Sequence, residues 1–367
     1  MKVLVIGYVH PKNDKRVFRT VKTLSKCYSV TYQYWTDKDE KEYEEDNIKY
    51  IPIKYEKGRK GNVITKYFRR RALDNTIYRI IKEEDYDILY LHYFLVTKPM
   101  KSFKLAKRKG KKIVYDIHEH HPQDFLSTLD GVLNDLKVIV LSKIFRKQLE
   151  LSDLAIFVSK EMLKDVLKNV NVDERKTIVV PNYASIIIKP EEKKKKKEIT
   201  FVGKDIRNFG NENQLLKSLI KYGFSVKLVG MEADNFSDLP HVYIPFLPYI
   251  EMMEEISKAY FSLISYDPPN SKYPKNYTFA LPNKFFDSIA AGTPVIVKNS
   301  FVSMANIVEK FGVGIVIDPS NLEESIEKIL KCCENYSTIL KNIEEYQELF
   351  VWNNEKENEF LRKIRDI

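Results

Sequence analysis

The part of this sequence that decides the fold reads Ala280-Leu281-Pro282-Asn283-Lys284-Phe285-Phe286-Asp287-Ser288-Ile289-Ala290-Ala291-Gly292-Thr293-Pro294-Val295-Ile296-Val297. Pro282 favours a helix start, because its missing N–H costs nothing in the first turn of a helix. Gly292 and Pro294 favour the end of that helix, since glycine adopts left-handed backbone angles and proline breaks a helix. The apolar run after Pro294 is typical of a buried strand. The stretch therefore predicts one helix–strand unit of an α/β protein.

The start of this helix has two features that suit a nucleotide. A helix N-terminus offers free N–H groups and a positive dipole end, which favour a diphosphate. Asp287, one turn further on, can accept hydrogen bonds from ribose hydroxyls, and Lys284 shares its face of the helix. A second interpretation is an ordinary α/β crossover with a solvated Lys284–Asp287 pair. The helix pattern alone leaves both interpretations open.

The bulk properties limit the class of protein. A length of 367 residues predicts two domains with their own cores. The formal net charge of +10 favours polyanionic partners in general, such as nucleic acid, anionic lipid or a sugar diphosphate. The three cysteines, Cys27, Cys332 and Cys333, form no disulfide framework, which predicts a reducing, cytoplasmic environment. No apolar run approaches the roughly 18–20 residues of a membrane-spanning helix.

Strands and helices alternate along the first half of the chain. Val3–Ile6 predicts a strand, Asp14 to Lys26 a helix, and Ser29 to Tyr34 a second strand. This order predicts a parallel α/β sheet. Gly7 stands alone where a dinucleotide fingerprint needs three glycines. Further strands are predicted at Ile88–Leu91, Ile113–Tyr115, Ala155–Val158 and Ile178–Val180.

The same alternation begins again after a lysine-rich segment. Residues 186–198 contain Pro190 and five consecutive lysines, which predict an exposed linker. Beyond it, strands and helices alternate up to a helix that ends at Cys333. The predicted elements are the strands Ile199–Val202, Ser225–Val229, Val242–Ile244, Phe261–Ile264 and Gly312–Ile317, and the helices Asn211–Tyr222, Tyr249–Lys258 and Leu322–Cys333.

A basic segment from Lys54 to Arg71 has two interpretations. Ile64, Tyr67 and Phe68 recur at helical spacing, and Arg69, Arg70 and Arg71 follow them. Such a pattern is typical of a basic amphipathic helix on an anionic bilayer. It is equally typical of a helix that packs on a core and turns its charges to water. The sequence does not choose between the two.

Three motifs together resemble a known family. A Pro-Asn-Lys turn opens the 282 helix, an acidic residue follows, and Ala-Gly-x-Pro-Val closes it. The run Asp14-Lys15-Arg16-Val17-Phe18-Arg19 resembles the opening Asp-x-Arg-Val-x-Arg, and Trp352-Asn353-Asn354-Glu355 resembles a terminal Trp-x-x-Glu. These motifs are similar to those of retaining glycosyltransferases of the GT-B fold, called family 4.

The resemblance implies an α/β fold of two Rossmann-like parallel-sheet domains that face across a cleft. Residues 1–185 would form the acceptor-binding domain, 186–198 the linker and 199–345 the nucleotide-sugar donor domain. Residues 346–367 would form a C-terminal helix that crosses back to the N-terminal domain.

The resemblance also implies roles for single residues. The donor diphosphate would lie on Gly203, Lys204 and Arg207 and on the helix start at Pro282, Asn283 and Lys284. Asp287 matches the second acid of the family's Glu-x7-Glu motif, whereas the first acid is replaced by Phe279, so Asn276 or Tyr277 would contact the sugar. His118 would lie at the reaction centre with Glu119 and Asp116 as partners. Asp14 and Arg16 would lie on the acceptor side.

No metal or cofactor is expected. Three nearby histidines, His118, His120 and His121, point to opposite faces of an extended segment and cannot share one ion. No Cys-x-x-Cys or His-Glu-x-x-His pattern supports a metal site. No nucleic-acid-binding module is evident either, so no nucleic acid partner is expected.

The predicted function is transfer of a sugar, with retention, from a UDP-sugar to a glycan, glycolipid or lipid-linked acceptor in cell-surface polysaccharide or glycoconjugate synthesis. The protein would be cytoplasmic, and peripheral on the inner membrane face if the basic helix binds lipid. Two alternatives stay open: a sugar-nucleotide 2-epimerase of the same fold, and a non-catalytic nucleotide-sugar-binding or scaffold protein.

Overall fold

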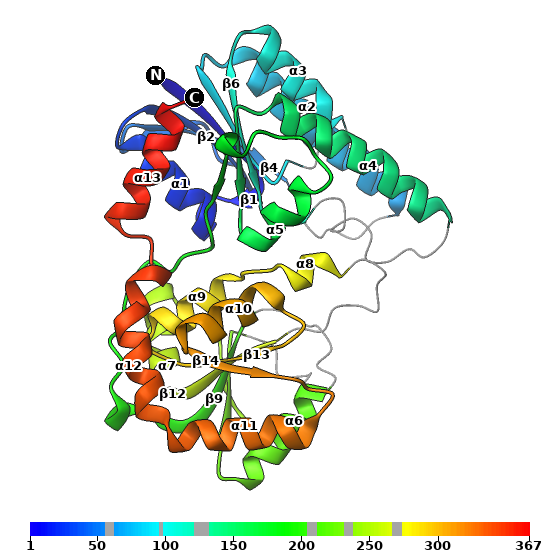
Figure 1. Cartoon of the computed structure of the whole chain (residues 1–367). Coiled ribbons are helices and arrows are strands. Elements are labelled where there is room, and N and C mark those ends of the chain that lie inside the picture. Colours follow the sequence, from blue (N-terminus) through cyan, green and yellow to red (C-terminus); the bar gives the residue numbers. More distant parts are fainter. Residues whose placement is uncertain (56–61, 95–97, 121–131, 204–210, 231–237, 266–273) are drawn as a thin grey trace. The chain divides into compact units, whose positions relative to one another are not determined.

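The computed structural model describes residues 1–55, 62–94, 98–120, 132–203, 211–230, 238–265 and 274–367 (Figure 1). The chain forms two compact units. Unit 1 contains Met1–Val180 together with Asn354–Ile367, and unit 2 contains Pro181–Asn353. Each unit has its own parallel sheet, so the predicted α/β class and the two-domain organisation agree with the structure.

Unit 1 is built on an eight-stranded sheet in the order β3-β4-β2-β1-β5-β6-β7-β8. All neighbouring strands are parallel except the β3–β4 pair at the edge. Strands β5 and β7 are buried along their whole length, as in a sheet covered on both faces. The strands are β1 (Lys2–Pro11), β2 (Ser29–Thr36), β3 (Tyr43–Glu45), β4 (Ile48–Lys54), β5 (Ile88–His92), β6 (Lys112–Ile117), β7 (Leu154–Phe157) and β8 (Thr177–Val179).

The helices of unit 1 connect these strands. In α1, Val17, Val21 and Leu24 are fully buried, because their spacing places them on one face of the helix. The helices are α1 (Lys15–Ser25), α2 (Val63–Glu83), α3 (Pro99–Arg108), α4 (Val132–Leu151), α5 (Lys160–Leu167), the short 3-10 helix η2 (Glu174–Lys176), and α13 (Asn354–Arg365).

The C-terminal helix α13 packs on unit 1. Its Glu357 accepts a hydrogen bond from Lys26 Nζ at 2.6 Å and one from Thr23 Oγ1 at 3.3 Å. Phe360 of the same helix lies 6.4 Å from the ring of Tyr90, centroid to centroid. The end of the chain thus belongs to the first unit, as the fold implied by the resemblance requires.

Unit 2 has a six-stranded, all-parallel sheet in the order β11-β10-β9-β12-β13-β14. The strands are β9 (Lys196–Val202), β10 (Ser225–Val229), β11 (Val242–Ile244), β12 (Ala259–Ile264), β13 (Val295–Lys298) and β14 (Gly314–Ile317). The helices are η3 (Glu192–Lys194), α6 (Asn211–Lys221), α7 (Tyr249–Ser257), α8 (Lys275–Thr278), α9 (Asn283–Ala290), α10 (Val302–Phe311), α11 (Leu322–Glu334), α12 (Tyr336–Tyr346) and η5 (Gln347–Phe350).

The segment 186–198, expected as an exposed linker, is grouped with unit 2, although four of its five consecutive lysines are exposed. Ile188 N donates to Ala290 O at 2.8 Å, and Lys195 Nζ donates to Gly292 O at 2.7 Å. Burial lowers the pKa of Lys195 to about 7. The lysine run also enters β9, which begins at Lys196. The repeated charge predicted exposure, and of the five lysines only Lys195, which bonds the end of α9, is half-buried.

Gly292 explains why the segment fits there. It takes the left-handed conformation predicted for it, with φ +73°. A Cβ at this position would lie 2.9 Å from Ile188 O and from two backbone atoms of Pro190. The end of α9 therefore needs glycine both for its backbone angles and for the close approach of residues 188–190.

Among the described helices, none is both long enough and apolar enough to cross a membrane.

Candidate functional site

The start of α9 offers backbone donors at the carboxyl end of β12. α9 begins at Asn283, directly after Pro282 in the N-cap position. Proline has no side-chain acceptor, so it does not cap the first-turn N–H groups as serine or aspartate would. Lys284 Nζ lies 3.3 Å from the carbonyl of Ser265, the residue that follows β12. The predicted helix is confirmed, and its electropositive end suits an anion.

Lys284 and Asp287 do not form the solvated pair of the second interpretation. Lys284 lies over the ring of Phe201, with Nζ 4.4 Å from the ring centroid. Asp287 is only 3% exposed and accepts a hydrogen bond from Tyr249 Oη at 2.8 Å. Burial and the nearby Asp287 charge raise the pKa of Tyr249. Asp287 is thus held in place by a neutral phenol from α7.

A buried ionic cluster beside α9 was missed by the sequence reasoning. Glu212, in the first turn of α6, pairs with Lys298 at the end of β13 and accepts from Ser265 Oγ. All three side chains are buried. The cluster lies at the carboxyl ends of β12 and β13, where open α/β sheets bind ligands. The one available signal was Lys298, a cation that directly follows the apolar run Val295–Val297.

The other donor-side residues have mixed outcomes. Gly203 follows β9 with φ +154°, which favours glycine, and its N donates to Val229 O at 3.1 Å; its contact with the diphosphate stays a prediction. Asn276 and Tyr277 are half-buried on α8. Lys204 and Arg207, expected to bind the diphosphate, lie outside the described residues.

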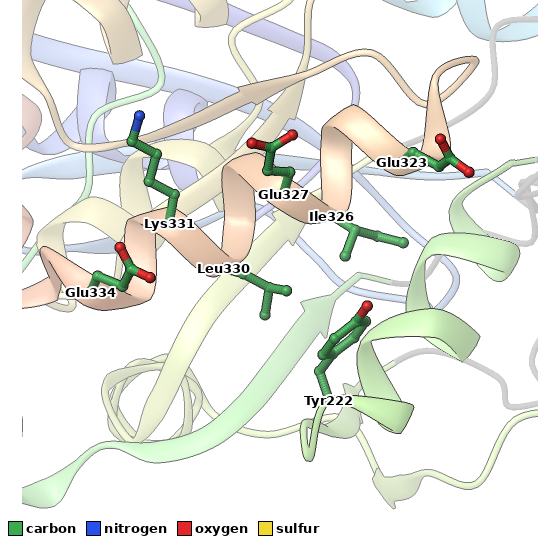
Figure 2. Close-up of a pocket in the computed structure, with 7 residues that line it drawn as sticks. All are labelled: Tyr222, Glu323, Ile326, Glu327, Leu330, Lys331 and Glu334. Atoms are coloured by element: carbon green, nitrogen blue, oxygen red, sulfur yellow. The ribbon is translucent and has the colours of Figure 1, made fainter.

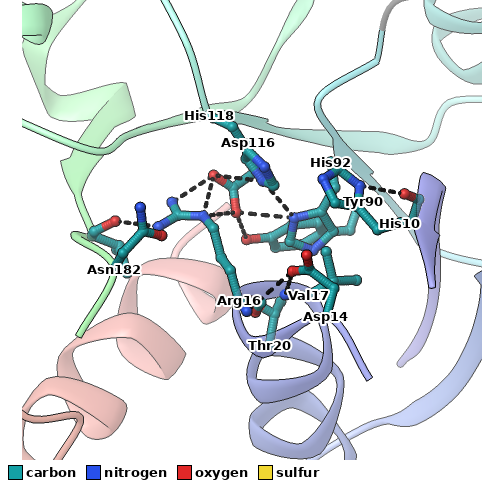
Figure 3. A network of polar contacts seen from close by, with 12 residues as sticks. His10, Asp14, Arg16, Val17, Thr20, Tyr90, His92, Asp116, His118 and Asn182 are labelled. Carbon is teal, nitrogen blue, oxygen red and sulfur yellow. Dashed lines mark hydrogen bonds and ion pairs between the residues drawn. The ribbon is translucent and has the colours of Figure 1, made fainter. Parts of the chain in front are cut away.

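A buried ion pair organises the carboxyl ends of the strands in unit 1 (Figure 3). Arg16 of α1 bonds Asp116 of β6 with Nη2 at 2.6 Å and Nε at 3.2 Å. Its Nη1 donates to Val180 O at 2.6 Å. Tyr90 Oη donates to Asp116 Oδ2 at 3.2 Å. These contacts satisfy most of the polar atoms that the pair buries.

Two histidines continue this network. His92 ends β5 and is fully buried, with Nδ1 3.2 Å from Asp116 Oδ2. The same Nδ1 lies 3.1 Å from Nε2 of His118, which follows β6 and is 14% exposed. The ring of Tyr93 stacks on His118 at 5.9 Å, and that of His10 lies 5.0 Å away. His118 therefore lies at the edge of this buried polar cluster, and its role at the reaction centre stays a prediction. His92 was missed because it ends an apolar strand.

Among His92, Asp116, His118 and Arg16, the carboxylate and the guanidinium are the groups that burial and their neighbours keep charged. Burial alone would raise the pKa of Asp116, but the Arg16 guanidinium and the neighbouring histidines outweigh it and hold that pKa well below its usual range. Burial lowers the pKa of His118 well below its usual value, and it lowers that of His92 as well, although Asp116 opposes both shifts. At neutral pH both imidazoles are uncharged beside an ionised carboxylate and a guanidinium.

Two residues in unit 1 have left-handed backbone angles, and one of them, Tyr93, stacks on His118. Tyr8 of β1 has φ +56° and Tyr93 after β5 has φ +40°. Such angles are costly for residues with a side chain, and they gather at functional sites. Tyr8 is held by its Oη, which donates to Asp74 Oδ1 at 2.8 Å, and by backbone contacts to Gln33. The strain adds to the case for a ligand site at these strand ends.

The two residues expected on the acceptor side have structural contacts within unit 1, and their acceptor-side role stays a prediction. Arg16 is only 4% exposed and pairs with Asp116. Asp14 caps α1 by accepting from the N–H groups of Arg16 and Val17. Glu119 is exposed beside His118.

His92, Asp116 and His118 are the described residues that come nearest to a metal site. One possible ligand atom from each lies within 4.8 Å of the other two. Neutral imidazoles and a carboxylate are suitable ligands. The Arg16 guanidinium, however, already neutralises Asp116 and would repel a cation placed beside it. The absence of a metal requirement stays a prediction.

The arginines of the basic helix α2 lie in two different environments, one against the protein and one exposed to solvent. Arg70 lies over the ring of Tyr8, 4.5 Å from its centroid, and near Asp74. It is therefore not a lipid-facing residue, contrary to the prediction. Arg71 is exposed and Arg69 half-buried. The apolar residues of the first turns are exposed, which contradicts the interpretation that they pack on the core; they are Ile64, Tyr67 and Phe68.

A groove of about 600 Å³ lies elsewhere in unit 2, between the end of α6 and α11 (Figure 2). Its lining includes Tyr222, Ile326 and Leu330 with the acids Glu323, Glu327 and Glu334. None of the predicted site residues lines it. An acidic groove also disfavours a nucleotide, so the candidate site stays at the strand ends.

Comparison with protein families places both halves of the chain. Residues 17–184 match the family described as Glycosyltransferase Family 4, and residues 199–353 match the family described as Glucosyltransferase 3-like, C-terminal domain. The chain belongs to the GT-B glycosyltransferases. A comparison with curated protein sequences gives no match.

Solved structures support the fold of this glycosyltransferase. Sucrose-phosphate synthase from Thermosynechococcus elongatus matches with a TM-score of 0.72 and 13% identity, over 100% of this chain and 98% of that one. HepE from Anabaena, in complex with UDP and glucose, matches with a TM-score of 0.67 and 12% identity over 100% of both chains. WaaG, a glycosyltransferase of lipopolysaccharide biosynthesis, matches with a TM-score of 0.63 and 12% identity over 95% of both.

The neutral histidines predict a pH-dependent stability for unit 1 of the glycosyltransferase. Their folded pKa values lie below the value of about 6.5 in the unfolded chain, so their stabilisation is full above about pH 6.5 and is lost as the pH falls. His118→Gln removes one such group and should reduce this loss by at most about 1.4 kcal/mol per pH unit. Urea unfolding at several pH values, in a Trp352→Phe background where Trp35 reports on unit 1, measures it. An equally steep loss in the variant would contradict a neutral His118.

Proposed function

We propose that this glycosyltransferase moves a sugar from a UDP-sugar to a hydroxyl of a glycan, glycolipid or lipid-linked acceptor, with retention. The observation that carries the proposal is the pair of family matches, one to each unit. Both units also have polar clusters at the carboxyl ends of their parallel strands, as ligand-binding α/β sheets do.

The donor half of the reaction would use unit 2. The uncapped start of α9 suits the diphosphate, and Gly203 permits close approach of the backbone. HepE, which has the same fold, is described in complex with UDP and with UDP-glucose, which favours a UDP-sugar here. Asp287 would accept from the ribose, although it already accepts from Tyr249. The contact between Asp287 and the ribose would then depend on the second carboxylate oxygen and on the orientation of the carboxylate.

The reaction itself would exchange one C–O bond for another. The bond from the anomeric carbon to the diphosphate breaks, and a bond from that carbon to the acceptor oxygen forms. The acceptor proton passes to an oxygen of the departing diphosphate. His118 would lie beside the donor sugar and donate a hydrogen bond to it, since a neutral imidazole can do so without adding charge.

The acceptor would be reached from a membrane surface. In unit 1, α3 packs against both α2 and α4. α2 exposes Ile64, Tyr67 and Phe68, and α4 exposes Leu136, Ile139 and Val140. Exposed apolar side chains next to Lys66 and Arg71 are typical of a surface that lies on anionic lipid. This location fits a lipid-linked acceptor and a peripheral position on the inner membrane face.

A donor panel tests the function. The full chain, treated with EDTA, is incubated with UDP-, GDP- and ADP-sugars, and nucleotide release is measured together with the sugar products. We expect release of UDP from one UDP-sugar. This release should persist in the presence of EDTA, because no step of the proposed reaction needs a metal. Isomerised sugar nucleotide would instead indicate an epimerase, and binding without any product would indicate a non-catalytic protein. Activity that disappears with EDTA and returns with a divalent cation would contradict metal independence.

Asp287→Ala tests the nucleoside contact. The loss of a charged acceptor should weaken UDP binding at least about tenfold, equal to about 1.4 kcal/mol. Tyr249→Phe is the matched control, because it removes only the hydroxyl that donates to Asp287. We expect that variant to change UDP affinity by less than about threefold. Calorimetric titration with UDP measures both. Unchanged affinity in Asp287→Ala would show that the carboxylate serves the fold alone.

Liposome flotation tests the membrane surface. Replacing Ile64, Tyr67 and Phe68 with glutamine should abolish binding to vesicles that contain phosphatidylglycerol, since these are the side chains that would enter the bilayer. The matched control replaces Tyr243, Phe246 and Ile250, which are similarly exposed in unit 2. Equal flotation of both variants, or of the wild type on purely neutral vesicles, would remove the membrane surface from the proposal.

A further inference from the structure

We propose that His92 is a positioning residue that determines which ring nitrogen of His118 carries the proton. His92 is fully buried at the end of β5. Among the described residues drawn in Figure 3, it is the side chain that lies close to both Asp116 and His118. Its Nδ1 lies 3.2 Å from Asp116 Oδ2 and 3.1 Å from His118 Nε2. The position of one proton on this nitrogen therefore affects both neighbours.

Two arrangements of the protons are conceivable. In the first, Nδ1–H of His92 donates to Asp116 Oδ2 and to His118 Nε2, so that His118 has its own proton on Nδ1. In the second, Nε2–H of His118 donates to Nδ1 of His92, and the proton of His92 lies on Nε2. The distances alone fit both arrangements, so the choice depends on the other atoms that each arrangement buries.

The surroundings of His92 favour the first arrangement. The second arrangement turns the Nδ1 lone pair of His92 toward the ionised Asp116, which is repulsive. It also buries an N–H at Nε2, an atom that has no hydrogen-bond partner among the described residues. A buried donor without an acceptor costs about as much free energy as a lost hydrogen bond, whereas a bare lone pair in an apolar setting costs less. The geometry thus assigns the proton of His92 to Nδ1.

His118 then presents a donor to a ligand. With its Nε2 accepting from His92, the neutral imidazole has its hydrogen on Nδ1. No described residue bonds Nδ1 of His118, and the side chain is 14% exposed. Tyr93 and His10 pack against the ring and limit its rotation. An oxygen atom of a bound ligand can therefore receive a hydrogen bond from a donor whose direction is fixed beforehand.

The meaning of this donor for catalysis rests on the proposed function. There, Nδ1–H of His118 would bond an oxygen of the nucleotide sugar, either on the sugar ring or on the leaving diphosphate. The same tautomer has no free basic nitrogen, so His118 would not remove the acceptor proton. The tautomer itself is a property of the resting protein and can be measured without any substrate.

The test is ring ¹⁵N NMR of the full chain labelled at histidine, with EDTA present and no nucleotide. Correlations from the ring C–H protons to each nitrogen show which nitrogen is protonated. His118→Gln and His92→Phe assign the two signals. We expect His92 and His118 of the wild type to be neutral with the proton on Nδ1. A proton on Nε2 of His118 in the wild type would overturn the proposal.

The variants separate positioning from simple packing. His92→Phe keeps the ring volume but removes the donor, so His118 should move its proton to Nε2, toward Asp116 Oδ1 at 3.8 Å. His92→Asn keeps an N–H near the former Nδ1 and should retain the wild-type tautomer of His118. Tyr90→Phe is the matched control, because it removes another donor to Asp116 without a contact to His118. A change of tautomer in the asparagine variant or in the control would contradict a specific role of His92.

Kinetics provide the second measurement once the donor panel has identified a substrate. His92→Phe should lower kcat at least about tenfold, while KM for the donor changes less, and His92→Asn should recover most of the loss. Transfer activity with His118 protonated on Nε2 would overturn the positioning role but not the function. The Nδ1 tautomer without transfer from any donor would overturn the function but not the positioning role.

Discussion

The site in unit 1 depends on the buried ion pair of Arg16 and Asp116. Desolvation makes an isolated charge in this position very costly, so each group requires the other. Arg16 also bonds the carbonyl of Val180, where the chain leaves unit 1, and thereby joins α1, β6 and the last residue of that unit. The pair therefore connects these elements of unit 1. It also places a carboxylate and a guanidinium next to His92 and His118, whose pKa values burial lowers.

Unit 2 also has a buried ion pair at the ends of its strands, formed by different residues. A parallel sheet covered by helices has an apolar interior, so charged groups are tolerated mainly at the strand ends. Glu212 and Lys298 pair there beside the start of α9, as Arg16 and Asp116 pair in unit 1. In both units a cation and a carboxylate from a helix and a strand fix the edge at which the sheet can bind a ligand. The two units therefore resemble each other in this buried ion pair as well as in their strand order.

The sequence predicted the regular elements well, because their causes are local. α9, β10 and β11 follow from apolar periodicity and from residues that start or stop a helix, and His118 could be singled out because it follows a strand. Contacts between distant residues could not be predicted in this way. His92 ends an apolar strand, Arg70 belongs to a basic run, and Lys195 belongs to a lysine block. In each case the local sequence pattern predicted the surroundings of the neighbouring residues correctly. The position of the side chain itself was determined by a contact with a residue far away in the sequence.

The charges of unit 1 also restrict how the proposed reaction can proceed. Asp116 is ionised but is already bonded by Arg16 and Tyr90, and both histidines are neutral. Within this cluster no group combines a free lone pair with enough basicity to take a proton from an alcohol at neutral pH. The departing diphosphate gains charge as its bond breaks and becomes basic at the moment when the acceptor hydroxyl becomes acidic. In the proposed reaction that proton would therefore pass to the leaving group, and the histidines, whose basicity burial lowers, would act as positioned hydrogen-bond donors.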